Sequence, residues 1–356
     1  MTLGTLTSVD ALDTATLSAL LATQYPGVRA EALLIREVIG GHTTKVRVTL
    51  DYNDVGAQLG LPRDLCIKAN WSGDALSSRL CILEAHFYRH IRDTVRLPIP
   101  RSTLVVWDER GRGQGLVAME DLHAGRGQFG DPVETLGVDA VAGALTQLAG
   151  LHAALWDSPR LDRYAWLPRS MARGTVDAQM HTILAPFIAC NLGTAPASEP
   201  WGSWLPGDHD RLDRAYGLFV AQEQAIRTPL CLIHGDAHHA NNFVRSTGDR
   251  LWLDWQFVRR GAPWRDVATF TISALEPGQR HLHEQDLLRH YLRELATHGV
   301  PDAPGFDLLW SRYRAWPIWG MVTWLSRLQE PDASAMARRF CCAAEDFGTL
   351  ELIEQE

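Results

Sequence analysis

The sequence changes character after Glu120, and this change limits the possible folds more than any other feature. Up to that residue, short aliphatic runs alternate with polar turns containing Gly, which is typical of strands. A short helix is expected within 1–27 and a longer one over 76–92, where apolar residues recur at spacings of three and four. The rest of the chain has helical patterns, interrupted by a β region at 230–254. We therefore predict an α+β fold with a small β-rich part over 1–120 and a larger, mainly helical part over 121–356.

The individual elements follow from the same patterns. Strands are expected at 33–35, 46–50, 65–69, 103–107 and 116–119. Helices are expected at 134–155, 173–189, 208–227, 264–275, 283–298, 306–328 and 332–353.

Composition excludes several classes of protein. The net charge of −8 over 356 residues gives no basic surface for nucleic acid. No apolar run reaches the roughly 18 residues that a membrane span requires, and the first residues do not form a secretory signal. The six cysteines contain no CxxC pair, so we interpret them as reduced thiols of a cytoplasmic protein. The oligomeric state stays open.

The strongest chemical signal is a polar loop that follows the apolar run Leu232-Ile233. It contains Asp236, and Asn241 comes five residues later; Asp254 then ends the apolar run 251–253. Phosphoryl transfer requires an acceptor for the proton of the substrate hydroxyl, oxygen ligands for Mg²⁺ and donors that hold the phosphates. Asp236 suits the first role. Asn241 and Asp254 carry the hard oxygen atoms that Mg²⁺ prefers.

This arrangement resembles the aminoglycoside phosphotransferase and choline kinase group of the kinase-like superfamily, whose catalytic loop reads His-Gly-Asp-x-x-x-x-Asn. Within the group it is most similar to the ecdysteroid-kinase-like branch. The residues that carry this similarity are Asp254-Trp255-Gln256, Gly261-Ala262-Pro263 and Asp266. The resemblance covers about residues 32–275. It implies a two-lobed protein-kinase-like fold, with 1–120 as the nucleotide-binding lobe and 121–356 as the catalytic lobe.

The resemblance also implies roles for individual residues. ATP and Mg²⁺ would be the cofactors, with Asp236 as catalytic base and Asn241 and Asp254 as metal ligands. Lys68 would bind the phosphates, and Glu84 would be its ion-pair partner. The pair Gly40-Gly41 would lie in the loop that covers the phosphates, although the full GxGxxG pattern is missing. Glu120 and Leu122 would belong to the hinge whose backbone meets adenine.

Departures from the protein-kinase pattern indicate a small-molecule alcohol as the acceptor. Asp254 is followed by Trp-Gln, where protein kinases carry Phe-Gly, and the next helix is expected from Trp264, only ten positions later. This segment leaves little room for an activation loop. His238 stands where protein kinases carry Lys, and small-molecule kinases commonly have His there.

Other interpretations of these residues remain open. Asp236 could be a turn former, Lys68 a solvated edge-strand lysine and Glu84 a helix-surface carboxylate. His238 and His239 could bind zinc, although no further ligands at suitable spacing accompany them. The whole protein could be a non-catalytic nucleotide-binding pseudokinase or an aminoglycoside-resistance phosphotransferase. The thirteen tryptophans could line an apolar acceptor pocket or pack the core.

Overall fold

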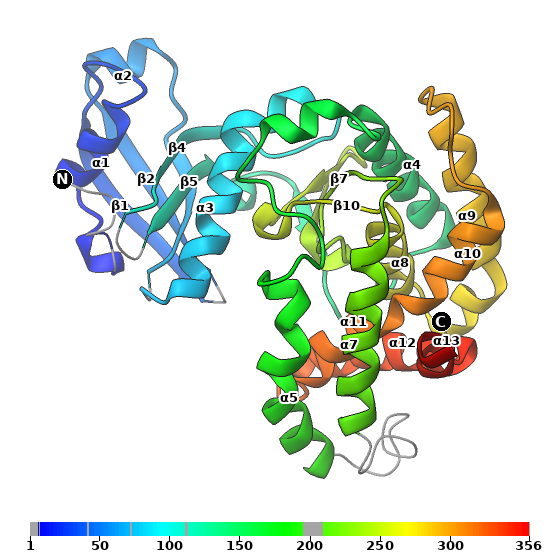
Figure 1. Cartoon of the computed structure of the whole chain (residues 1–356). Helices are drawn as coiled ribbons and strands as arrows, with labels where there is room; N and C mark the ends of the chain where they lie inside the picture. Colours follow the sequence, from blue (N-terminus) through cyan, green and yellow to red (C-terminus); the bar gives the residue numbers. More distant parts are fainter. Residues whose placement is uncertain are drawn as a thin grey trace. The chain divides into compact units, whose positions relative to one another are not determined.

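The computed structural model describes residues 6, 8–40, 43–71, 73–110, 113–194 and 209–355. The backbone forms two compact units (Figure 1). Unit 1 comprises Met1–Gln128 and Phe243–Val258, and unit 2 comprises Phe129–Asn242 and Arg259–Glu356. These units are compact parts of the backbone, and their bounds do not show which part binds a nucleotide. The division into a nucleotide-binding lobe and a catalytic lobe at residue 120 therefore stays a prediction.

Unit 1 is built on an antiparallel sheet of five strands in the order β1-β2-β3-β5-β4. The strands are β1 (Ala30–Ile39), β2 (Thr44–Tyr52), β3 (Asp64–Ala69), β4 (Ser102–Asp108) and β5 (Gln114–Glu120). All five expected strands are therefore present, and each is longer than the apolar run that signalled it. The alternation in β2 places Val46, Val48 and Leu50 on one face, where all three are buried.

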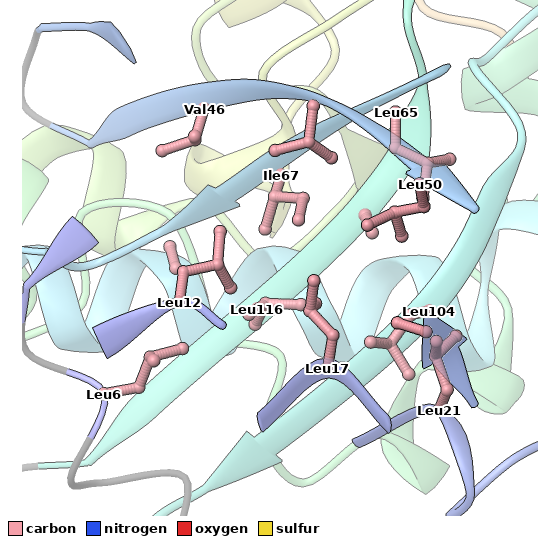
Figure 2. Close-up of a cluster of buried hydrophobic side chains, with 14 of the residues drawn as sticks. Leu6, Leu12, Leu17, Leu21, Val46, Leu50, Leu65, Ile67, Leu104 and Leu116 are labelled. Atoms are coloured by element: carbon pink, nitrogen blue, oxygen red, sulfur yellow. The ribbon is translucent and has the colours of Figure 1, made fainter. Parts of the chain in front are cut away.

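The two faces of this sheet are covered differently. Helix α1 (Thr14–Leu21) contributes Leu17 and Leu21 to the core on the face of Val46 (Figure 2). Helix α3 (Ala75–His90) packs against β4 and β5. Gly115 permits this packing, because a Cβ there would lie 2.2 Å from the carbonyl oxygen of Cys81 on α3. Aspartates cap both helices, since Asp13 accepts from the N–H of Thr16 and Asp74 from that of Ser77.

Two features of the β-rich regions were not predicted. A short helix, α2 (Asp54–Gln58), lies in the polar stretch between β2 and β3. The expected β region at 230–254 divides between two sheets: β8 (Asn242–Arg245) and β9 (Arg250–Trp252) pair with β6 (Gly127–Phe129), whereas β7 (Cys231–Ile233) pairs with β10 (Arg259–Gly261). Strands of three or four residues carry too little periodicity to be recognised in sequence.

Unit 2 is mainly helical. Its helices are α4 (Val138–Ala154), α5 (Val176–Thr194), α7 (His209–Ala225), α8 (Trp264–Ala274), α9 (Pro277–Thr297), α10 (Phe306–Ala315), α11 (Pro317–Leu325), α12 (Pro331–Phe347) and α13 (Thr349–Gln355). None of the helices in the described ranges is long and apolar enough to cross a membrane.

Two helices predicted as continuous are each divided, so these predictions were wrong in extent. Residues 306–328 form α10 and α11, because Pro317 cannot continue the hydrogen-bond ladder of α10 and instead begins α11. Residues 332–353 form α12 and α13, because Gly348 ends α12 in the left-handed conformation, with φ of 58°.

Candidate active site

A buried cluster of charged side chains in unit 1 is centred on Lys68 of β3. The Nζ of Lys68 lies 2.7 Å from Oε2 of Glu84 on α3 and 2.6 Å from Oδ1 of Asp254. The Lys68 side chain is only 2% exposed and that of Glu84 only 1%, whereas that of Asp254 is 18% exposed. The structure thus brings the predicted pair Lys68 and Glu84 together and adds Asp254, which lies 186 residues after Lys68 in the sequence.

This cluster contains two carboxylates for one ammonium. Burial by itself would lower the pKa of Lys68, but the charges of Asp254 and Glu84 outweigh it and raise that pKa above its ordinary value. Burial raises the pKa of Glu84, and the charge of Lys68 opposes the rise only in part. Lys68 therefore stays protonated, and its charge is already matched inside the protein.

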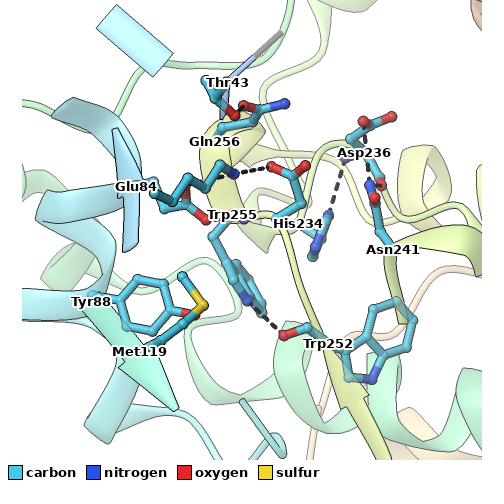
Figure 3. Close-up of polar contacts among 12 residues, drawn as sticks. Thr43, Glu84, Tyr88, Met119, His234, Asp236, Asn241, Trp252, Trp255 and Gln256 are labelled. Carbon is cyan, nitrogen blue, oxygen red and sulfur yellow. Dashed lines mark hydrogen bonds and ion pairs between the residues drawn. The ribbon is translucent and has the colours of Figure 1, made fainter. Parts of the chain in front are cut away.

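The backbone after Asp254 fixes the cluster. Asp254 has φ of 62°, a left-handed conformation that few residues other than Gly adopt. The next N–H, that of Trp255, donates to Oε1 of Glu84 at 3.1 Å. The Trp255 ring is stacked on Phe87 of α3 at a centroid distance of 4.0 Å. Glu84 and Trp255 are labelled in Figure 3.

The predicted phosphate-covering loop is described only in part. Gly41 lies outside the described residues. Gly40 is surrounded by open space, since nothing lies within 4 Å of the position that a Cβ would occupy, so no close packing requires glycine there. After the loop, buried Thr43 donates from its hydroxyl to Oε1 of Gln256 at 3.2 Å (Figure 3). This contact ties the start of β2 to the segment that follows Asp254.

The predicted hinge residues both have structural contacts. The N–H of Glu120 donates to the carbonyl of Arg101 at 2.9 Å, and the Glu120 carboxylate accepts from the N–H of Arg101 at 3.0 Å. Leu122 is buried against Phe243 and Leu251. Their side chains therefore serve the packing of unit 1, and a base-binding role at these positions would fall to the backbone.

The loop after β7 holds the catalytic candidates of unit 2. The amide nitrogen of Asn241 donates to the backbone carbonyl of Asp236 at 2.8 Å, and Nε2 of His238 lies 3.7 Å from Oδ2 of Asp236. Gly235 has φ of 84°, a conformation that favours glycine, and it turns the chain so that the Asp236 N–H meets Nδ1 of the buried His234 at 3.3 Å. Figure 3 labels His234, Asp236 and Asn241.

Asp266 anchors this loop from the first turn of α8. Its carboxylate accepts from the N–H of His234 at 2.6 Å and from that of Gly235 at 2.9 Å. His152 of α4 lies 3.2 Å from the same carboxylate, and its other ring nitrogen lies 2.8 Å from the hydroxyl of Tyr291 on α9. Burial opposes ionisation of Asp266, but these partners outweigh it and lower its pKa.

Sequence reasoning missed this anchoring role. From the sequence, Asp266 is only one of the residues that carry the family resemblance. The available signal was the charge of Asp266 in a helix that faces the core. Every residue of α8 is buried, and a buried carboxylate requires partners.

Asp266→Asn should destabilise the fold by about 2–4 kcal/mol, because an amide replaces a buried carboxylate that accepts from two backbone N–H groups. Asp286→Asn is the matched control, since the Asp286 side chain is 81% exposed and its pairing with Arg289 should contribute little. Urea unfolding measures both changes. A shift for Asp266→Asn no larger than that of the control would contradict the anchoring role.

His239 is a structural residue in this arrangement. Its backbone N–H donates to the hydroxyl of Ser273 at 3.2 Å, and its Nε2 lies 2.7 Å from the carbonyl oxygen of Asp131. Burial lowers the pKa of His239 to about 4, so the ring is neutral at pH 7. Over the described ranges, no three His, Cys, Asp or Glu side chains are grouped so as to hold a metal ion by themselves.

Asn241 in unit 2 and Asp254 in unit 1, each considered by itself, offer oxygen atoms of the kind that Mg²⁺ prefers. Mg²⁺ in phosphoryl-transfer sites is typically held by one or two protein oxygens, with phosphates and water completing its shell. Because the nitrogen of Asn241 donates within the loop, its oxygen is the atom that can bind a cation. Asp254 supplies a carboxylate that is less buried than the Lys68 and Glu84 side chains beside it.

Comparison with known proteins gives a family match over part of the chain and solved structures of the same fold. Residues 210–299 match the sequence model of the ecdysteroid kinase-like family. No curated protein matches the sequence. A Ralstonia eutropha protein proposed to be an aminoglycoside phosphotransferase aligns with a TM-score of 0.54 and 14% identity, over 96% of this chain and 98% of its own. The GDP and kanamycin complex of an aminoglycoside 2″-phosphotransferase aligns with a TM-score of 0.52 and 15% identity, over 96% and 98%.

The fold is therefore the kinase-like fold, with an N-terminal antiparallel sheet and a mainly helical C-terminal portion, as predicted. Residues 210–299 are similar to the ecdysteroid kinase-like family, the branch that the sequence motifs indicated. The predicted resemblance is confirmed.

Proposed function

We propose that this protein transfers the γ-phosphoryl group of ATP to a hydroxyl group of a small molecule. The observation that carries the proposal is the loop around Asp236, whose backbone is held by Asn241 and by the buried Asp266. Positioning and electrostatic stabilisation account for most of catalysis in phosphoryl transfer. A carboxylate on a rigid loop is suited to that task.

Each residue then has a defined role. Asp236 orients the substrate hydroxyl and accepts its proton as the oxygen attacks the γ-phosphorus, and the bond between that phosphorus and the β–γ bridging oxygen breaks to release ADP. Asn241 and Asp254 would hold Mg²⁺, which neutralises phosphate charge when bound. Lys68, fixed by Glu84, would orient the phosphates. The backbone at Glu120 and Leu122 would meet the base, and the loop of Gly40 and Gly41 would cover the phosphates.

The acceptor is proposed only as a small-molecule alcohol in the cytoplasm. Seven tryptophans of the described chain are buried, namely Trp71, Trp252, Trp255, Trp264, Trp316, Trp319 and Trp324. Core packing therefore accounts for these seven, and they give no support to an apolar acceptor pocket. The short segment between Asp254 and Trp264 still argues against a protein acceptor.

A mass-spectrometric screen tests the proposal. The protein is incubated with ATP, Mg²⁺ and panels of aminoglycosides, amino alcohols and hydrophobic or glycosidic alcohols, and products heavier by one phosphoryl group are sought. Asp236→Asn is the control and should form product at least about 100-fold more slowly. Tight ATP binding without any product would favour a pseudokinase, and products from aminoglycosides alone would favour a resistance enzyme.

A further inference from the structure

Lysine is almost absent from this protein. Of its 34 lysine and arginine side chains, only Lys45 and Lys68 are lysines. The two lie directly opposite each other on the antiparallel strands β2 and β3. Opposite residues of such a pair project from the same face of the sheet, with Cβ atoms about 4.5–5.5 Å apart. The only lysines of the chain thus form a cross-strand pair.

The face that the two lysines share is the face of the ion cluster. Val46, the neighbour of Lys45, is fully buried in the hydrophobic core on the opposite face. Cys66 precedes Lys68 by two residues and so shares its face. Burial raises the pKa of the Cys66 thiol to about 11, and the charges of Lys45 and Lys68 both oppose this rise. Both ammonium groups therefore act on the same thiol.

The two lysines differ in their partners. Lys68 is buried and engaged by Glu84 and Asp254, so its charge is already compensated. Lys45 is half-buried, and no ion pair joins it to any residue that the structure describes. Of the two lysines, Lys45 therefore has the charge that an anion arriving from the solvent can bind.

On the basis of the proposed function, we propose that Lys45 is a second phosphate-binding lysine, whose ammonium group binds the terminal phosphate oxygens of the nucleotide. Lys68 then orients the phosphates with a charge that Glu84 and Asp254 already match, and Lys45 supplies the uncompensated charge. A compact ammonium suits a point contact with phosphate beside a second lysine, whereas a planar guanidinium requires more room and a bidentate geometry. Arginine serves at the other basic positions of the chain.

Chemical labelling tests the assignment in the intact protein. The full chain is treated with an amine-reactive acetyl ester alone, with ATP, with tripolyphosphate or with AMP, and acetylation at each lysine is quantified by mass spectrometry. Lys45 should be acetylated readily alone and at least about tenfold more slowly with saturating ATP, because a charged hydrogen bond contributes about 1.5–3 kcal/mol. Tripolyphosphate should protect it and AMP should not. Buried Lys68 is the internal reference.

Nucleotide titration of variants provides the second measurement. Lys45→Met should weaken ATP binding by about 10- to 100-fold and leave AMP binding unchanged, and Lys45→Arg should restore part of the loss. Arg63→Met is the matched control, because it removes an exposed cation that pairs with Asp51. Asp51 lies on β2 six residues after Lys45, which places this pair about 20 Å from Lys45. Arg63→Met should bind ATP like the wild type.

The outcomes separate the two proposals. Wild-type protein that binds no ATP would overturn the proposed kinase function and, with it, the role of Lys45. If the wild type and Lys45→Met bind ATP equally well, the role of Lys45 is overturned and the proposed kinase function stands. Equal losses for ATP and AMP in that variant would also overturn it, because they would indicate a role in folding.

Discussion

Replacing Asp236 with Asn is expected to lower kcat by about 10²–10⁴-fold, the usual scale for the loss of a proton acceptor. Affinity for ATP should stay near the wild-type value, because Asp236 is assigned to the hydroxyl of the acceptor. The fold should also persist, since the shorter contact from Asn241 runs to the backbone carbonyl of residue 236 at 2.8 Å, and the side-chain oxygen of Asn can still accept the longer one of 3.4 Å.

Steady-state kinetics on the true acceptor, together with ATP titration, measures both effects. Asp249→Asn is a suitable control, because Asp249 is an exposed aspartate in the turn between β8 and β9. An unchanged kcat in Asp236→Asn would remove Asp236 from the reaction. A loss of ATP affinity as large as the loss of kcat would instead place it with the nucleotide-binding residues.

Asp254→Ala is expected to weaken Mg²⁺-dependent ATP binding by about 100-fold, and Asn241→Ala by about tenfold, because a carboxylate offers a full charge to a hard cation and an amide only a dipole. Asp254→Ala also removes one of the two carboxylates that hold Lys68. Asp254→Asn separates these effects from backbone strain, since Asn tolerates the left-handed conformation at this position better than Ala does.

Calorimetric titration of ATP with and without Mg²⁺ compares the three variants, and thermal unfolding without nucleotide checks that each is folded. The Mg²⁺-dependent part of ATP binding should fall more in Asp254→Ala than in Asn241→Ala. Small and equal losses in all three would mean that the metal is bound elsewhere.

Local chemistry determined much of what the sequence revealed. The alternation in residues 46–50 and the helical spacing over 76–92 reflect which side of an element meets the core, and this information lies within a few residues. The loop from His234 to Asn241 could be recognised for the same reason, since its glycine, its carboxylate and its amide act over short distances. Pro317 and Gly348 also act locally, but the predictions treated the helices over 306–328 and 332–353 as continuous, and the structure divides them there.

The tertiary structure alone decided which distant groups meet. Asp254 reaches Lys68 across 186 residues, and Asp266 reaches the N–H groups of His234 and Gly235 across 32 and 31. Period-two alternation shows which face a strand residue occupies, but the residue opposite depends on register. The pairing of Lys45 with Lys68 therefore emerges only from the alignment of β2 with β3, because register is set by packing of the whole sheet and by the connecting segment between the strands.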